Sequence, residues 1–150
     1  MNDSDSLTPM LKLALLTAKS QHEFFSSTAK KVEMPEVKAL LLVLAEEEYK
    51  MIAKIQHMIA TGILDELEEL KRVDDRDEIP DPSPFDPFRE ESDPRIFICN
   101  KSLEKTLRSY KLYLQFATKA KSEVVSLLFE YLAYLKMHQI DKLRKVCRTF

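Results

Sequence analysis

The chain has 150 residues, a length typical of one domain, and 45% of them are hydrophobic. It contains one glycine and no tryptophan, a composition that disfavours turn-rich β-sheets and predicts an all-α protein. The formal net charge is −2, so no overall field attracts the chain to nucleic acid or to a membrane surface. We therefore expect a single domain over residues 1–150 with neither of these partners.

Residues 9–62 are predicted to form a hairpin of two helices. Thr8-Pro9 is typical of a helix start, because the hydroxyl caps the helix and proline needs no N–H partner at its first position. Pro35 opens the second helix in the same way, and Gly62 is a natural terminator. Spacings of four and three predict an inward stripe on the first helix, formed by Leu11, Leu15, Ala18, His22, Phe25 and Ala29.

An acidic triplet, Glu46-Glu47-Glu48, lies in the apolar second helix. The helical period places Glu48 on the inward stripe with Leu44 and Met51. A buried carboxylate costs free energy unless it is paired, hydrogen-bonded or bound to a metal. In four-helix bundles a Glu-x-x-His motif on such a helix binds metal, but the residue three positions after Glu48 is Met51.

Residues 63–100 are predicted to form an acidic, proline-rich connection. Five prolines between positions 80 and 94 disfavour a helix or a central strand there. A connection of this length suggests a crossover that leaves the two flanking helices parallel. Phe85 and Phe88 lie among acidic residues, and such exposed aromatic side chains are a candidate contact for an unidentified protein partner.

Residues 101–149 are predicted to form a second helical hairpin. Its first helix is expected to start at Asn100 or Ser102, and Ser122 is the expected cap of its second helix. Residues 101–150 carry eleven basic and four acidic groups, whereas residues 63–100 carry five basic and thirteen acidic groups. This pattern indicates solvated helix faces and an acidic connection that partly neutralises the basic half.

The two cysteines, Cys99 and Cys147, do not have the spacing of a metal site. The first residues are acidic rather than basic, so we expect no signal peptide and a reduced, cytoplasmic protein. A disulfide between the two cysteines is the alternative. No apolar run approaches 18 residues, so no membrane span is expected.

The fourth predicted helix repeats the second at an offset of 88 residues without gaps. The matched pairs include Val37/Val125, Leu40/Leu128, Leu44/Leu132, Ala45/Ala133, Ile52/Ile140 and Lys54/Lys142. The first and third helices share a weaker echo, Phe24-Phe25 with Ala29 against Gln115-Phe116 with Ala120. Two similar hairpins predict a pseudo-twofold four-helix bundle.

The aromatic pair Phe24-Phe25, the turn before Pro35-Glu36 and the run ending in Ala45-Glu46-Glu47-Glu48 resemble the rubrerythrin branch of the ferritin-like superfamily. The resemblance implies a ferritin-like four-helix bundle of two antiparallel hairpins joined by a long crossover. In that family each hairpin supplies one Glu from its first helix and a Glu-x-x-His from its second. These six residues bind two iron ions for peroxide or oxygen chemistry.

The resemblance also identifies which residues occupy the six ligand positions. Only one of the six positions carries a ligand of the family, namely Glu48. The six positions are Ala18, Glu48, Met51, Ser109 or Tyr110, Lys136 and Gln139. Because Lys136 replaces a carboxylate, we predict that its ammonium group pairs with Glu48 across the bundle.

Three functions follow as hypotheses. The preferred one is a non-catalytic bundle that has lost its di-iron site, has no cofactor or catalytic residue, and serves as an interaction or oligomerisation module. The resemblance implies a homo-dimer or other homo-oligomer. The first alternative is a di-iron oxidoreductase that binds iron through rearranged ligands, for which Glu48, His22 and His138 are available. The second is a module that binds an apolar small molecule in the space near Ala18, Met51 and Ser109.

Overall fold

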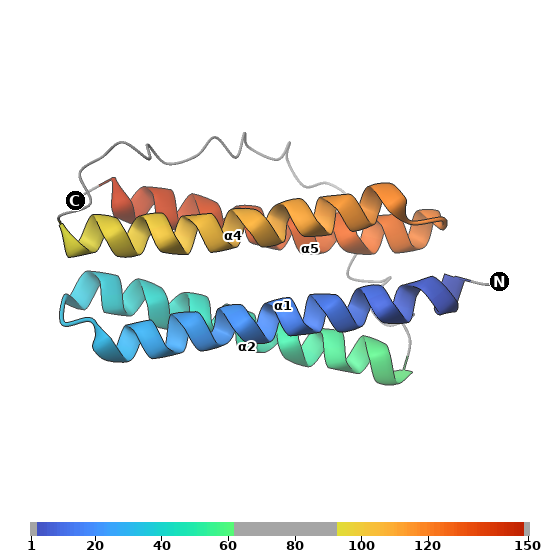
Figure 1. Cartoon of the computed structure of the whole chain (residues 1–150), viewed down its shortest axis with the longest axis horizontal. Coiled ribbons are helices and arrows are strands. Elements are labelled where there is room, and N and C mark those ends of the chain that lie inside the picture. The colour runs from blue at the N-terminus through green and yellow to red at the C-terminus, as the bar shows by residue number, and fades with distance from the viewer. Residues whose placement is uncertain (1–2, 62–92, 149–150) are drawn as a thin grey trace.

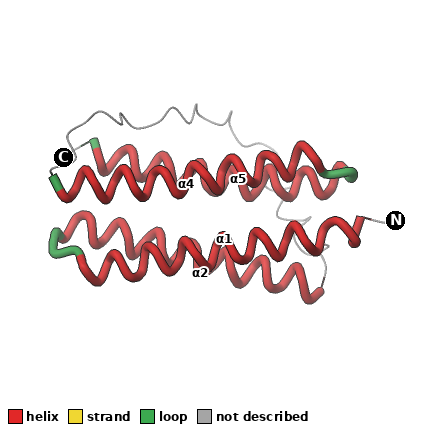
Figure 2. The backbone as a smooth tube through the Cα atoms, in the orientation of Figure 1, coloured by secondary structure: helices red, strands yellow, loops and turns green. Residues whose placement is uncertain are grey.

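A computed structural model of the chain describes residues 3–61 and 93–148. These residues form four helices and no strand, namely α1 (Asp3–Lys31), α2 (Pro35–Thr61), α4 (Pro94–Lys119) and α5 (Glu123–Cys147). Helices α1 and α2 form one antiparallel hairpin, α4 and α5 form a second, and the two hairpins lie against each other as two layers (Figure 1). Figure 2 shows that loops are confined to the short turns and helix ends in this part of the chain.

None of the four helices combines the length and apolar character that a membrane crossing requires.

Helices α2 and α4 run in the same direction (Figure 1). The last residue of α2 and the first residue of α4 therefore lie at opposite ends of the bundle. Most of the segment that joins them, residues 62–92, lies outside the described residues. The crossover, and the partner contact through Phe85 and Phe88, stay predictions for this reason.

Two of the four predicted helix starts are confirmed and two are wrong. Helix α2 begins at Pro35, and the Ser122 hydroxyl accepts hydrogen bonds from the first turn of α5. Helix α1 begins at Asp3 and runs through Pro9, which is exposed and lies inside the helix rather than at its first position.

The start of α4 lies before the predicted Asn100 or Ser102. It begins at Pro94, where the Asp93 carboxylate accepts a hydrogen bond of 2.9 Å from the backbone N–H of Arg95. Asp93-Pro94 is thus a capping residue followed by proline, the same signal that marks helix starts elsewhere in the sequence. The last of the prolines in the acidic connection starts a helix rather than extending the connection.

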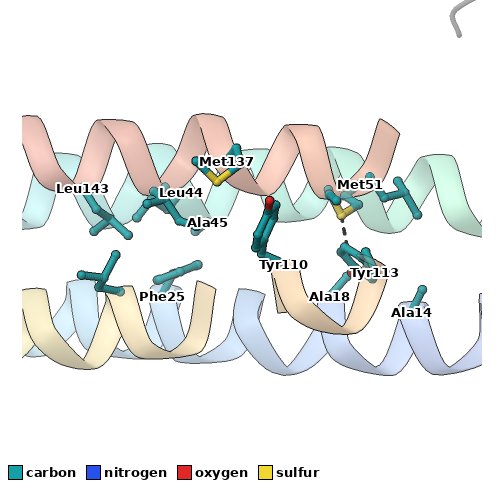
Figure 3. Packing of buried hydrophobic residues seen from close by; sticks show 14 of the residues in the cluster. Ala14, Ala18, Phe25, Leu44, Ala45, Met51, Tyr110, Tyr113, Met137 and Leu143 are labelled. Atoms are coloured by element: carbon teal, nitrogen blue, oxygen red, sulfur yellow. Dashed lines mark hydrogen bonds between the residues drawn. The ribbon is translucent and has the colours of Figure 1, made fainter. Parts of the chain in front are cut away.

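The core lies between the two layers, where apolar side chains of all four helices meet (Figure 3). On α1 the inward stripe differs from the predicted one at two positions. Ala14 and Gln21 are buried, whereas Leu15 and His22 are half-buried. Spacings of four and three fit either choice, and the helix uses three then four from Leu11 onwards.

The offset of 88 residues relates the two hairpins as a whole. Helix α1 ends at Lys31 and α4 at Lys119, while α2 begins at Pro35 and α5 at Glu123. The buried residues of α1 and of α4 are related by the same offset. The matched pairs are Leu11/Cys99, Ala14/Ser102, Ala18/Thr106, Gln21/Ser109, Phe25/Tyr113 and Ala29/Ala117. The alignment of Phe24-Phe25 with Gln115-Phe116 is therefore wrong, because it shifts α4 by three residues.

Cys99 and Cys147 form a disulfide between the first turns of α4 and the last turn of α5, with their Cα atoms 6.1 Å apart. The expectation of a reduced pair is wrong. The two positions lie almost symmetrically about the turn at residues 120–122, so an antiparallel hairpin brings them together. Disulfides are typical of oxidising compartments, so the cytoplasmic location loses this support and stays a prediction.

Candidate functional site at the bundle centre

A buried ion pair joins the two hairpins at the centre of the bundle. The Lys136 ammonium group on α5 contacts the Glu48 carboxylate on α2, as predicted, and both side chains are 0% exposed. The two residues are 88 positions apart, so they occupy equivalent places in the two hairpins. The pair therefore lies on the pseudo-twofold axis of the bundle.

The Lys136 ammonium group has three N–H donors, and each has an acceptor. It donates to Glu48, to the Gln21 amide oxygen at 2.6 Å and to the Gln139 amide oxygen at 3.2 Å. The Gln21 amide nitrogen in turn donates to the backbone carbonyl of Lys105 on α4 at 2.9 Å. One hydrogen-bonded network thus connects all four helices.

Burial determines the electrostatics of this network. Loss of water lowers the pKa of the Lys136 ammonium group, while the carboxylate of Glu47 raises it. Glu48 Oε2 is buried and has no hydrogen-bond partner within the described residues. A charge in this environment is tolerated only with a close partner, so each member of the pair depends on the other.

The other predicted ligand positions are also buried, but their side chains are not iron ligands. Ala18, Met51, Tyr110 and Gln139 all lie in the interior. The Tyr113 hydroxyl donates to the Met51 sulfur at 3.9 Å, and Figure 3 shows this contact near Ala18. Burial raises the pKa of the Tyr113 hydroxyl.

The internal repeat gives a different match for Ala18 on the third helix from the predicted Ser109 or Tyr110. The offset of 88 matches Ala18 with Thr106, rather than with Ser109 or Tyr110. Thr106 is fully buried, and its hydroxyl donates to the Ser102 carbonyl at 2.8 Å. The signal was present in the sequence, because the gap-free repeat of the second and fourth helices extends through equal turns into the first and third.

The two histidines considered as alternative ligands form no metal-binding group with Glu48 among the described residues. His22 is half-buried, and its ring lies 6.1 Å from that of Tyr49, an exposed residue. His138 is exposed and packs edge-on against Tyr134. Across residues 3–61 and 93–148 no three His, Cys, Asp or Glu side chains group closely enough to hold a metal ion.

The donor set at the centre does not fit a pair of iron ions. Di-iron sites use carboxylates and imidazoles, whereas here a single carboxylate faces an ammonium group and two amides. A metal cation would have to displace the Lys136 ammonium group from Glu48, the carboxylate that pairs with it among the described residues. The arrangement can hold the helices in register.

Two pockets open on opposite sides of this centre, one in each groove between the hairpins. The α1–α4 pocket, of about 440 Å³, includes Gln21 and Ser109 in its wall. The α2–α5 pocket, of about 370 Å³, includes Met51 and Gln139. Each of these residue pairs is related by the offset of 88, so the pseudo-twofold axis passes through both pockets and the ion pair.

Comparisons with known proteins give no family assignment. A scan against protein-family models, a search of curated proteins and a search of solved structures each found no match. The likeness to the ferritin-like superfamily therefore rests on the residues of this chain alone.

Proposed function

We propose that this chain is a ferritin-like bundle of the rubrerythrin type that has lost di-iron binding and acts as a non-catalytic interaction and oligomerisation protein. The carrying observation is that the Lys136 ammonium group donates to the buried Glu48 carboxylate. By the resemblance, Lys136 takes the place of a metal-binding carboxylate of the family. In this proposal the ion pair replaces the charge balance that metal ions would supply. The crossover between the hairpins is part of the same proposal.

Metal analysis tests the loss of iron binding. Protein purified from iron-supplemented cells is expected to contain far less than one iron per chain by elemental analysis. Close to two irons per chain, retained through gel filtration, would favour the di-iron oxidoreductase with rearranged ligands and overturn the proposal.

A restoration variant tests the ancestry of the site. It carries Ala18→Glu, Met51→His, Thr106→Glu, Lys136→Glu and Gln139→His, which with Glu48 complete the six ligands of the family. We expect this variant to bind iron and to gain thermal stability when iron is added. A variant that folds but does not bind iron would argue against a ferritin-like origin.

A matched variant tests the ligand position on α4. It carries Tyr110→Glu in place of Thr106→Glu and is otherwise identical. Because Thr106 is the residue that matches Ala18, the variant with Tyr110→Glu is expected to bind iron more weakly. Equal binding by the two variants would contradict the register that relates the hairpins.

The oligomerisation part of the proposal is supported by exposed apolar side chains. Five of the eight exposed large hydrophobic residues in the described part of the chain lie on α1 and α2, namely Leu13, Leu16, Leu42, Val43 and Tyr49. Leu16 is 64% exposed and Tyr49 is 59% exposed. These five side chains belong to one hairpin, and we propose that a second copy of the chain covers them.

Sedimentation velocity tests this interface. The native chain is expected to sediment as a dimer or larger homo-oligomer, and Leu16→Glu with Tyr49→Glu is expected to yield monomers. Leu127→Glu on α5, 36% exposed in the native chain, serves as the matched control and should leave the assembly intact. If the native chain stayed monomeric over a 100-fold range of protein concentration, the proposed oligomer would be refuted.

A further inference from the structure

We propose that the α2–α5 pocket is a binding site for a small organic dicarboxylate. The proposal goes beyond the loss of iron binding and does not depend on it, because it rests on the groove outside the central ion pair. The pocket volume of about 370 Å³ lies within the range of roughly 300–1,000 Å³ that is usual for ligand sites.

The pocket wall is cationic on both sides. Lys50 and Lys54 contribute two ammonium groups from α2, and Lys142 contributes a third from α5. Glu47 is the one carboxylate in the wall, so the lining has a net charge of +2 with His138 neutral.

The charged groups of the wall are held in place by neighbours. The Lys54 ammonium group donates to the Tyr131 hydroxyl at 3.2 Å and lies 5.2 Å from the centre of its ring. Because the Tyr131 oxygen accepts this bond, its hydroxyl hydrogen is left to donate into the pocket. Lys142 contacts Glu47 at the opposite side. Two fixed lysines and a hydroxyl donor suit a carboxylate ligand.

The symmetry of the pocket favours a ligand with two acidic groups. Four lining residues of α2 each have a lining partner 88 positions later on α5, and these pairs are Glu47/Leu135, Lys50/His138, Met51/Gln139 and Lys54/Lys142. The lysines of the last pair therefore lie on opposite sides of the axis. Near the axis, Met51 and Leu135 supply an apolar floor that suits a short hydrocarbon spacer.

Calorimetric titration of the full chain with glutarate tests the site. We expect saturable binding of one glutarate per chain and at least about tenfold weaker binding of butyrate, which has one carboxylate. Lys54→Gln and Lys142→Gln should each weaken glutarate binding by about tenfold, because each removes one charge-assisted hydrogen bond. Glu47→Gln should tighten binding, since it removes the one anion from the wall.

The control is Lys38→Gln, which removes an exposed lysine of α2 outside the pocket and should leave glutarate affinity unchanged. Lys142 is exposed, whereas Glu47 and Lys54 are half-buried, so thermal unfolding of each variant checks that it remains folded. Absence of saturable glutarate binding below roughly 10 mM, equal affinity for butyrate, or tighter binding of inorganic phosphate would overturn the proposal. None of these outcomes bears on iron content, so the two proposals fail separately.

Discussion

The central ion pair gives the sharpest test of how the bundle is held together. Lys136→Met leaves the fully buried Glu48 carboxylate without its charged partner, and two amide oxygens lose their donor. Breaking a buried pair in this way costs about 3–5 kcal/mol. Since about 1 kcal/mol shifts the melting temperature of a domain of this size by about 2–4 °C, we expect a fall of about 6 °C or more.

The double variant Lys136→Met with Glu48→Gln distinguishes charge pairing from simple packing. It buries no charge, so it should be more stable than Lys136→Met alone. The coupling energy between the two sites is expected to be about 2 kcal/mol or more, at the upper end of values for contacting residues. Urea unfolding, followed by far-ultraviolet circular dichroism, gives the free energy of unfolding of the native chain, the two single variants and the double variant, which together form the double-mutant cycle.

A second ion pair on the same two helices provides the control. Lys142 contacts Glu47, but these side chains are 46% and 27% exposed. Lys142→Met is therefore expected to cost less than about 1 kcal/mol. If Lys136→Met and Glu48→Gln each left the unfolding midpoint unchanged, or if their losses simply added, the central pair would not be the element that we describe.

Two further predictions concern other parts of the core. Reducing the Cys99–Cys147 disulfide, which closes a loop of 48 residues, should lower the free energy of unfolding by about 4 kcal/mol. Urea midpoints with and without dithiothreitol measure this loss, and Cys147→Ser should show no response to the reductant; an unshifted native midpoint would contradict the estimate. The pKa of Tyr113 is raised in the folded state, so only the unfolded chain releases this proton once the pH passes 10. The free energy of unfolding of the native chain should therefore decrease as the pH rises above 10. The free energy of unfolding of Tyr113→Phe should decrease less steeply over the same pH range. If the two free energies changed in parallel with pH, the raised pKa of Tyr113 would be refuted.

Most of the fold could be predicted from the sequence, because helix signals and apolar periods are local. The scarcity of glycine correctly predicts an all-helical fold for the described residues. Pro35 and the Ser122 cap correctly predict where α2 and α5 begin. The predicted start of α4 is wrong because Pro94 continues the run of closely spaced prolines in the acidic connection. Its capping residue, Asp93, carries the information that separates it from them.

The candidate site was predicted in part, and the residue missed on α1 shows what the helical period leaves open. The repeat of α2 and α5 led to the contact between Glu48 and Lys136. On α1 the helical period alone could not choose between Gln21 and His22, because adjacent residues near the edge of a stripe fit it almost equally. The decision comes from tertiary packing, in which the Gln21 amide oxygen accepts a hydrogen bond from Lys136.

Apart from the Glu48–Lys136 contact, features formed by residues distant in sequence were hard to predict. The disulfide depends on the register of α4 against α5, and this register follows from the length of the turn between them. The α2–α5 pocket depends on side chains from both hairpins, whose relative placement is a property of the folded bundle. Neither feature has a local sequence signal.

The position of the ion pair on the pseudo-twofold axis also decides which hairpins can associate. The inner faces of the two hairpins share one pattern of buried positions, so shape alone would let a hairpin pair with a copy of itself. Two α1–α2 hairpins would then bring two Glu48 carboxylates together in the core, and two α4–α5 hairpins would bring two Lys136 ammonium groups together. Like charges at such a distance, away from water, are strongly unfavourable. The opposite charges of Glu48 and Lys136 thus favour association of the two different hairpins and disfavour association of two identical ones.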